Sequence, residues 1–442
     1  MNVRFLKNEY DVVVAGGGIA GISAAVKAGR LGAKVILIEQ YGFVGGMSTA
    51  GMVSPFMKHS IKDEILVRGI FEELEKGMIK RKGMIDNGFY ASAFRFAALE
   101  LLRNARVDVL LNASIIKVNR EKDRIKSLNI LIHGYDIEIR GKVFIDTTGD
   151  AQLVYLGNFS YVKGDEKTGK LQALTLFFRM GGIDFVRALD YVKKHKEDFF
   201  SWMTFDFDLA KIISVAGYFS TVKKAIAQGR LSEDVNYIFY TTLPESGEAS
   251  FNTSNILGLD GSTSSDLTKA EFIGREQVWQ VVNLLRDDIP GFENSYLLET
   301  AIQVGVRETR RAIGDYVVQE EDITKFRKFD DAIARGCYGI DIHGQKDEES
   351  RLDEMPENDF YEVPLRALIV SDAKNLLVAG RCISATRKAH GALRIMPTSS
   401  ATGEASGALA ALAIKNNKSV REVNPTEVKR LILHNLSSRF SS

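Results

Sequence analysis

The chain has 442 residues, enough for two or three domains, and its 45% hydrophobic and 26% charged residues are typical of a soluble globular protein. The 58 Lys plus Arg nearly balance the 57 Asp plus Glu, which leaves no electrostatic attraction for nucleic acid or an anionic membrane, so neither is expected as a partner. Two cysteines are too few for a disulfide framework and favour a reducing, cytoplasmic setting.

The first predicted element is a phosphate-binding turn between a strand and a helix. Residues 11–15, DVVVA, are typical of a buried parallel strand, and Gly16, Gly18 and Gly21 follow in G-x-G-x-x-G spacing. These glycines allow a tight turn, close backbone approach to a pyrophosphate and tight helix packing. A helical stretch and a second strand follow and end at Glu39, which is placed to accept hydrogen bonds from a ribose. The unit predicts a dinucleotide site, and its glycines exclude a signal peptide or a membrane span.

The next predicted elements extend the same sheet. Gly45 and Gly46 lie where the chain that leaves the second strand can fold back over the pyrophosphate. Residues 106–131 alternate as strands around the polar turn REKDR. Residues 135–153 add two more strands and contain Thr147-Thr148-Gly149-Asp150, which would lie at the carboxyl ends of the strands, where open α/β sheets bind ligands.

The middle of the chain does not read as a second nucleotide-binding fold. Residues 235–258 predict a hairpin around Pro244 to Gly247, and residues 268–291 predict a helix with a capping box of Thr268 and Glu271. Residues 295–316 predict a strand and then the start of a helix. The sequence has no second G-x-G-x-x-G, no C-x-x-C and no zinc-ligand spacing, so neither an NAD(P)H domain nor a metal is expected.

Two elements close the chain. Residues 375–381, NLLVAGR, read as a last strand, and the small residues of 394–407, RIMPTSSATGEASG, predict a helix that begins near Thr402.

Together these motifs resemble the FAD-dependent oxidoreductases of the glutathione-reductase-like superfamily, and in particular a largely bacterial family with mostly uncharacterised members. The resemblance covers almost the full length and rests on Gly16–Gly21, Gly45-Gly46, Thr147–Asp150, a helical segment at Gly305–Arg311, Ala379–Arg381 and Arg394–Gly407. TTGD replaces the more usual alanine-led form. Relatives in the wider superfamily end the last strand in Gly-Asp, whereas this chain has Gly380-Arg381, which favours a phosphate contact over a ribityl contact.

The resemblance implies an α/β fold with FAD as cofactor. A Rossmann-like FAD-binding domain, a parallel sheet with helices on both faces, would comprise residues 1–165 and 371–442, and a mixed α+β substrate domain would comprise residues 166–370. The last helix would point its N-terminus at the flavin ring, where its dipole favours the negative charge of the reduced form. We expect the cofactor to contact Gly16, Gly18, Ile19, Ala20, Gly21, Glu39, Gln40, Gly45, Gly46, Met47, Ile116, Thr148, Gly149, Gly380, Arg381, Ser400, Ala401 and Thr402.

Three residues are the candidates for catalysis. Arg394 and Arg307 could hold a carboxylate, and His343 could carry a proton. Arg310 and Arg311 share the motif of Arg307, and ion pairing with acids such as Glu308 is the alternative for all three arginines. His390 is a weaker candidate of the same kind as His343, and Cys382 is expected to be buried.

The sequence therefore predicts a flavoenzyme that transfers a hydride between flavin N5 and a small organic substrate, with a carboxylate-bearing substrate left open. One alternative is a biosynthetic relative of thiazole synthases without net redox turnover. Another is a flavin-free binding protein on the same fold, as in GDP-dissociation inhibitors, but the intact phosphate-binding glycines favour a flavin. A homo-oligomer is left open.

Overall fold

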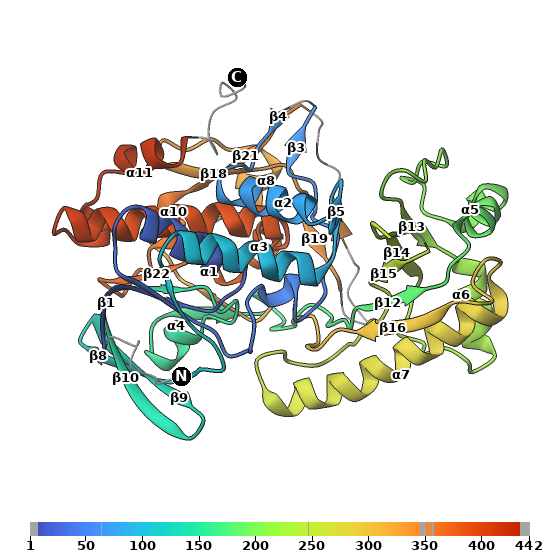
Figure 1. Ribbon diagram of the computed structural model, residues 1–442, viewed down its shortest axis with the longest axis horizontal. Helices are drawn as coiled ribbons and strands as arrows, with labels where there is room; N and C mark the ends of the chain where they lie inside the picture. The colour runs from blue at the N-terminus through green and yellow to red at the C-terminus, as the bar shows by residue number, and fades with distance from the viewer. Residues whose placement is uncertain are drawn as a thin grey trace.

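The computed structural model describes residues 8–62, 64–245, 247–344, 351–353, 355 and 358–433. Two sheets organise these residues and lie apart from each other (Figure 1). In the main sheet the strand order is β7-β2-β1-β10-β9-β8, with β22 paired to β10 as well. Its strands are β1 (Glu9–Ala15), β2 (Val35–Ile38), β7 (Asp108–Leu110), β8 (Ser114–Glu121), β9 (Arg124–Ile132), β10 (Tyr135–Asp146) and β22 (Leu376–Val378).

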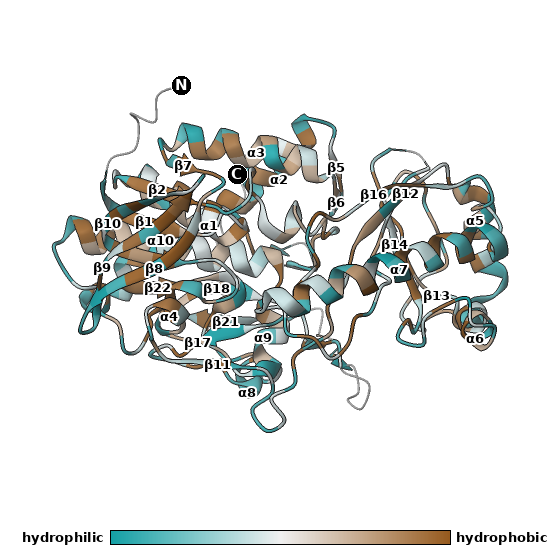
Figure 2. Ribbon diagram, turned by 90° about the horizontal axis from the view of Figure 1, so that it is seen from below, coloured by the Kyte–Doolittle hydropathy of each residue, from teal (hydrophilic) through white to brown (hydrophobic). Residues whose placement is uncertain are grey.

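The centre of this sheet is parallel and buried on both faces. Strands β7, β2, β1, β10 and β22 pair in parallel. Along β1, Val12 and Val14 pack into the core on one face, while Val13 and Ala15 pack into the core on the other. This two-sided burial explains the unbroken apolar run that predicted the strand. Figure 2 shows the brown colour of hydrophobic residues along the central strands of the sheet.

Strand β10 corrects one prediction, because residues 135–146 form one strand and not two. Its first half pairs antiparallel with β9, and its second half pairs in parallel with β1 and β22. The chain changes partners at Arg140 without turning, since that residue pairs with both β9 and β1. The expected hairpin around the polar turn is confirmed by the antiparallel pairing of β8 and β9.

Helices cover one face of the main sheet, and on the other face the side chains of its own strands β8 and β9 complete the core. The first face carries α1 (Ile19–Arg30), α2 (Ile70–Lys80), α3 (Ala91–Asn104) and α10 (Met396–Lys415). The second face packs against the β8–β9 ribbon and the short helix α4 (Gln152–Leu156). The helix α11 (Pro425–Leu431) packs against α10.

Helix α10 begins at Met396, earlier than predicted, and lies side by side with α1 (Figure 1). Pro397 lies in its first turn, where a missing N–H costs nothing because first-turn N–H groups have no intrahelical partner. The helix therefore starts at the proline, and the small residues that follow form its interior. Two of them, Gly403 and Gly407, face α1 so closely that a Cβ on either would collide with a backbone carbonyl.

The second sheet is antiparallel, with the order β13-β14-β15-β12-β16. The hairpin expected around residues 244–247 is confirmed by the pairing of β14 with β15, although residue 246 lies outside the described residues. The strands are β12 (Phe178–Gly181), β13 (Ser214–Gly217), β14 (Ile238–Thr242), β15 (Ala249–Phe251) and β16 (Tyr296–Thr300), and the helices around them are α5 (Phe185–Lys194), α6 (Phe219–Ala227) and α7 (Ser264–Asp288).

The long helix α7 starts before the predicted capping box. Thr263 caps it by accepting a hydrogen bond from the Asp266 N–H, whereas Thr268 lies inside the helix and donates to the Ser264 carbonyl. The Thr and Glu spacing at 268 and 271 also occurs here within a helix, so the predicted capping box is wrong.

The segment around Gly305–Arg311 is also not a helix. It runs extended into β17 (Arg310–Ala312), which pairs with β11 (Tyr161–Lys163), and in this conformation the Arg311 side chain donates to the Ala385 and Gly164 carbonyls. The other short elements are β3 (Ser60–Ile61), β4 (Glu64–Ile65), β5 (Met84–Ile85), β6 (Gly88–Phe89), α8 (Glu320–Thr324), β18 (Ala332–Gly336), β19 (Asp341–Ile342), β20 (Arg351–Leu352), β21 (Tyr361–Pro364) and α9 (Arg387–Leu393).

Two large hydrophobic cores accompany the two sheets. The core between the main sheet and its helices includes side chains from residues 318–369, and the core of the second sheet takes most of its side chains from residues 174–306. The domain boundaries at 165/166 and 370/371 stay a prediction. In the part of the chain that is described, no helix is both long and apolar enough to cross a membrane.

The contact between α1 and α10 generates a stability prediction. Gly403→Ala places a methyl group against the Ala20 carbonyl, so the two helices must separate. Overpacking of this kind costs about 1–3 kcal/mol, and we expect a clearly lower Tm in thermal unfolding. Lys415→Ala, at the exposed end of the same helix, is the control and should change stability by less than about 0.5 kcal/mol. An unchanged Tm for Gly403→Ala would show that the helices are not in this close contact.

Candidate functional site

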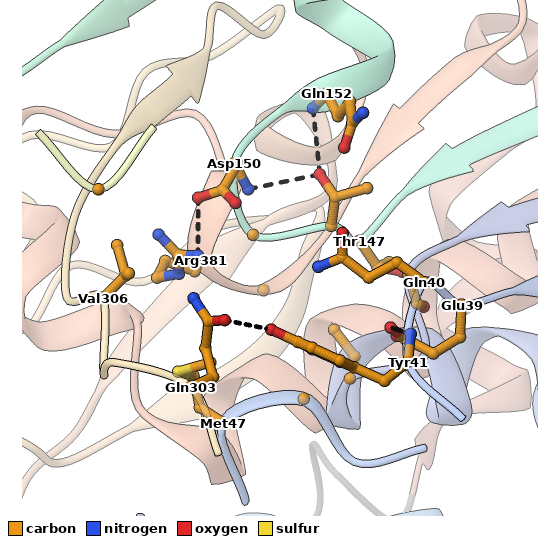
Figure 3. A pocket seen from close by; sticks show the side chains of 18 of the residues that line it. Glu39, Gln40, Tyr41, Met47, Thr147, Asp150, Gln152, Gln303, Val306 and Arg381 are labelled. Carbon is orange, nitrogen blue, oxygen red and sulfur yellow. Dashed lines mark hydrogen bonds and ion pairs between the residues drawn. The ribbon is translucent and has the colours of Figure 1, made fainter. Parts of the chain in front are cut away.

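A cavity of about 660 Å³ lies at the carboxyl ends of β1, β2 and β10. Ligands bind at this edge of an open α/β sheet, and the volume is in the usual range for small-molecule and cofactor sites. The wall is formed by the glycine turn after β1, the residues after β2 and β10, the N-terminus of α10, and loops that enter from the second sheet (Figure 3).

The glycine turn makes a cradle of backbone on one side of the cavity. Gly16 has φ +97°, and a Cβ on it would lie 2.7 Å from the Thr147 carbonyl oxygen. A Cβ on Gly18 would have only the Gly46 Cα, 3.9 Å away, within 4 Å, so a side chain there would fill the cavity. Gly45 N–H donates to the Gly17 carbonyl at 2.7 Å, so the second glycine loop folds back on the first as expected. Such a cradle fits a pyrophosphate.

Glu39 lines the cavity and also fixes the turn. Its carboxylate accepts hydrogen bonds from the N–H groups of Gly17, at 2.6 Å, and Tyr41, at 2.9 Å. Burial raises the pKa of Glu39, and these backbone hydrogen bonds oppose the rise. The carboxylate therefore holds the turn in place, and its expected contact with a ribose stays a prediction.

Tyr41 connects the two halves of the wall. Its hydroxyl donates to Gln303 Oε1 at 2.6 Å across the cavity (Figure 3). Burial, and secondarily the charge of Glu39, raise the pKa of Tyr41 to about 12, so the phenol stays protonated. Because Gln303 belongs to the loop after β16, this hydrogen bond ties that loop to the main sheet.

Arg381 lies in the cavity wall beside a carboxylate. Its Nη2 is 2.8 Å from Asp150 Oδ1, which also accepts from the Thr309 hydroxyl at 2.7 Å (Figure 3). Its guanidinium lies so close to Gly149 that a Cβ there would be 2.8 Å from Nη2. Asp150 thus compensates the charge of Arg381, and the expected phosphate contact of Arg381 stays a prediction.

The N-terminus of α10 reaches the cavity through Met396 and Ser399. In the described part of the chain no side chain caps this end. Pro397 has no N–H and the Ser399 N–H donates to the Ile395 carbonyl, so Met396 and Thr398 supply the N–H groups that a ligand could reach. The positive end of a helix dipole stabilises a nearby negative charge by about 0.3–1 kcal/mol when exposed and up to ~2 kcal/mol when partly buried. The expectation of a helix N-terminus at the cofactor site therefore shifts from Thr402 to Met396.

Most of the expected cofactor residues line the cavity, and five do not. Those in the wall are Gly16, Gly18, Ile19, Ala20, Glu39, Gln40, Gly45, Gly46, Met47, Thr148, Gly149, Gly380 and Arg381. Gly21 instead allows close packing, since a Cβ on it would collide with the Gly16 carbonyl. Ile116 is 43% exposed, and its neighbour Ile115 lines the cavity.

The other three lie inside α10, behind the wall. Ser400 exchanges a hydrogen bond of 2.7 Å with Ser23 of α1, and Thr402 accepts one of 3.2 Å from the Gly380 N–H. Ala401, which lies between Ser400 and Thr402 in the sequence, is also buried. Because the helix starts earlier than predicted, these residues hold α10 in place and do not line the cavity.

The three candidates for catalysis come together around Asp341, which the sequence analysis did not single out. Arg394 lines the cavity and donates to Asp341 Oδ2 at 2.9 Å. His343 Nε2 lies 3.3 Å from Asp341 Oδ1, and the Tyr338 hydroxyl donates to Oδ2 at 3.1 Å. Arg307 is 9% exposed and donates to the Ala173 carbonyl at 2.7 Å.

Burial and charge set the ionisation of this cluster. Burial would raise the pKa of Asp341, but His343, Arg394 and Arg307 hold it well below its ordinary value, so Asp341 is ionised. Burial and the charge of Arg307 lower the pKa of His343, and Asp341 opposes that shift. His343 is therefore neutral at pH 7 and can accept a proton.

The remaining arginines of the motif have other roles. Arg311 is fully buried and forms ion pairs with Glu308 and Glu166, which bears out the ion-pair alternative for this residue. Arg310 lines the cavity and lies 4.0 Å from the centre of the Tyr155 ring.

The two weaker candidates are both buried. The Nε2 of His390 lies 2.8 Å from the Arg381 carbonyl oxygen, within hydrogen-bond distance. His390 is fully buried, so a structural role explains its position. Cys382 is buried as expected.

Several residues in the cavity wall carried no signal in the sequence. Gln303 and the residues around the start of α7, 261–264, come from loops of the second sheet, whereas Val306 lies in the Gly305–Arg311 motif. Their place depends on how that sheet packs over the main one, which no local pattern reveals. Asp150 is different, since the sequence analysis placed it, within the Thr-Thr-Gly-Asp motif, at the ligand-binding end of a strand, and it lines the cavity.

Comparison with known proteins identifies the family of this chain. A family profile described as "FAD dependent oxidoreductase" matches residues 11–432. The dihydrolipoyl dehydrogenase of Manduca sexta is 30% identical over 155 residues, which cover 29% of this chain and 30% of that protein. The chain thus aligns with less than a third of that relative's length.

Solved structures are similar at lower identity. A geranylgeranyl bacteriochlorophyll reductase-like protein from Thermoplasma acidophilum is 14% identical, with a TM-score of 0.47, and the match covers 96% of this chain and 82% of that one. The L-proline dehydrogenase from P. horikoshii is also 14% identical, with a TM-score of 0.43 and coverage of 96% and 99%.

The position of Glu39 generates a prediction on cofactor affinity. Glu39→Gln keeps the shape but replaces a carboxylate oxygen by an NH₂ group, which cannot accept from the Gly17 or Tyr41 N–H. Hydrogen bonds to charged groups are worth about 1.5–3 kcal/mol, so we expect FAD to bind about tenfold more weakly, or worse, in a fluorescence titration of apoprotein. Glu121→Gln, on the exposed end of β8, is the matched control. Equal affinity of Glu39→Gln and wild type would mean that this carboxylate contributes nothing to the site.

Proposed function

The chain belongs to the family of FAD dependent oxidoreductases, and on that premise we propose that it transfers a hydride between a small organic substrate and N5 of the flavin. FAD is the cofactor that the family uses. The observation that carries the proposal is that a buried acid–base cluster around Asp341 meets, through Arg394, the same cavity as the glycine cradle.

The residues of the wall fit the parts of FAD. The cradle of Gly16, Gly18 and Gly46 would hold the pyrophosphate, and Glu39 would bind the adenosine ribose. The start of α10, at Met396, would lie against the flavin ring. When bound, FAD supplies a two-electron centre at N5.

His343 would move the proton of the reaction. Neutral imidazole can take a proton from a substrate hydroxyl or amine as hydride leaves the neighbouring carbon. Asp341, at 3.3 Å, would hold the ring in place and stabilise the imidazolium that forms. Arg394 shares that carboxylate and would orient the substrate at the cavity.

The alternatives from the sequence differ in what they would do with the flavin. A flavin-free binding protein would leave the glycine cradle without a ligand, and membership of a family that uses FAD argues against it. A thiazole-synthase-like protein would keep FAD but show no net redox turnover.

The experiment that tests the proposal has two steps. Purified protein should carry a yellow cofactor that runs as FAD on chromatography. Anaerobic mixing with a panel of alcohols, amines, hydroxy acids and amino acids should then bleach the flavin with at least one compound. A protein that binds no FAD even when it is supplied contradicts the proposal, and FAD that no compound bleaches favours the thiazole-synthase-like alternative.

The role of His343 generates a prediction on pH. His343→Gln cannot accept a proton, so we expect the anaerobic bleaching rate to fall about 10²–10⁴-fold with FAD retained. In wild type the lowered pKa keeps His343 neutral at pH 7, so the rate should fall only as the pH drops through that pKa, and the variant should lose this dependence. His195→Gln, an exposed histidine of the second-sheet region, is the control. A variant with the wild-type rate and pH profile would remove His343 from the reaction.

A further inference from the structure

We propose that the substrate carries a carboxylate and that Arg307 and Arg394 bind it beside His343. The inference rests on the proposed function, because it names the substrate class of the same site. It starts from a positive charge in the interior of the protein that is not fully balanced.

Arg307 is a buried guanidinium whose hydrogen-bond partners are neutral. Its Nη1 donates to the Ala173 carbonyl at 2.7 Å, and its Nη2 lies 3.4 Å from the Asn252 side-chain oxygen. No carboxylate within the described ranges forms an ion pair with it. Burial, and secondarily the charge of Arg394, lower its pKa to about 10, so it remains charged at neutral pH. The charge of Asp341 also acts on Arg307, but Arg394 shares that carboxylate, so the two guanidinium groups have one negative charge between them. A buried charge that is not fully balanced is costly, and an anionic ligand would supply the missing negative charge.

Arg307 differs from three arginines around it, which have carboxylate partners, and from Arg310, which has no ion pair among the described residues but is only half-buried. Arg311 has Glu308 and Glu166, and Arg381 has Asp150. Arg394 shares Asp341 with His343.

The charge count of the cluster favours a monoanion. Two guanidinium groups, Arg307 and Arg394, face the one ionised carboxylate of Asp341, and His343 is neutral. Counted over the described residues, the cluster therefore has one net positive charge. A carboxylate balances it, whereas a dianionic phosphate ester would leave a buried negative charge uncompensated.

Unused hydrogen-bond donors point to the same ligand. Gln172 is fully buried, and its Nε2 has no partner among the described residues. The orientation of the Gln172 side chain is fixed because its oxygen accepts from the backbone N–H of His343 at 3.2 Å. If the side-chain amide of Gln172 were turned around, its NH₂ group would face that N–H, donor against donor. Arg394 Nε is a second buried donor, and it too has no hydrogen-bond partner among the described residues. A carboxylate offers acceptor positions for several such donors at once.

The cluster borders the cofactor cavity through Arg394, whereas Arg307, Asp341 and His343 are not among the residues that line it. Arg394 lies in the cavity wall, as does Val306, the neighbour of Arg307. Arg394 lies between α9 and α10 on the main-sheet side, whereas Arg307 belongs to the loop between β16 and β17. A carboxylate held by both would place the adjacent carbon of the substrate between the two parts of the molecule, near His343.

The test is a titration of the FAD-loaded protein with acetate, pyruvate and benzoate, each against its neutral amide, and with inorganic phosphate. Perturbation of the flavin absorbance and the rise in Tm are the two readouts. We expect at least one carboxylate to bind ten times more tightly than its amide. In Arg307→Met this preference should disappear, Arg307→Lys should retain part of it, and both should keep the FAD spectrum. Arg187→Met, which removes an exposed ion pair with Glu293, should behave as wild type.

Stability separates a binding role of Arg307 from a structural one. Without ligand, Arg307→Met should melt at or above the wild-type temperature, because an apolar side chain replaces a buried charge. A fall of several degrees that Arg307→Lys does not restore would make the arginine structural and overturn the proposal. Carboxylates that bind no better than amides, or phosphate binding that depends more strongly on Arg307, would overturn it too. Loss of FAD from the wild type would instead contradict the proposed function, and the two failures are therefore distinguishable.

Discussion

The close contact between helices α1 and α10 is the constraint on which the rest of the structure depends. Gly403 and Gly407 allow the backbone of α10 to lie directly on the carbonyls of Ala20 and Ala24. A buried ion pair between Lys27 and Glu404, at 3.0 Å, connects the same two helices. The contact brings the glycine turn at the start of the chain and the N-terminus of α10 near its end to one cavity.

The second constraint is that the cavity is closed by loops of another sheet. The hydrogen bond from Tyr41 to Gln303 ties the loop after β16 to the main sheet. The same loop continues to Arg307, so the geometry of this incompletely balanced charge depends on how the two parts of the molecule pack. The loop that lines the cavity at Gln303 therefore continues into Arg307, the residue proposed to bind the substrate.

The sequence predicted those parts of the site that local chemistry determines. After a buried strand, the spacing of Gly16, Gly18 and Gly21 predicts a tight turn that approaches a pyrophosphate. The length of the strand–helix–strand unit then predicts that Glu39 ends its second strand. Arg394 and the Thr-Gly-Asp motif were found because they stand next to elements of that fold. These features are encoded by neighbours in the chain, so the structure places them as expected.

The rest depended on contacts between distant segments. Residues 305–311 were expected to be helical, but Arg311 finds Glu308 and Glu166 in an extended backbone, and strand pairing with β11 decides the conformation. The start of α10 was expected at Thr402, although Pro397 suits a first turn. Asp341 had no motif at all, and only the fold shows that it joins Arg394 and His343.

The central claim is that the first turn of α10 faces the flavin ring within the cavity that the helix contact creates. A crystal structure of the protein with FAD tests it most directly, through the distance from the backbone nitrogens of Met396 and Thr398 to the isoalloxazine. We expect at least one of them within hydrogen-bond distance, about 2.7–3.2 Å, of the ring's N1 or C2 oxygen. If both of them lie more than about 8 Å from the ring, roughly one Debye length at physiological salt, the claim is contradicted.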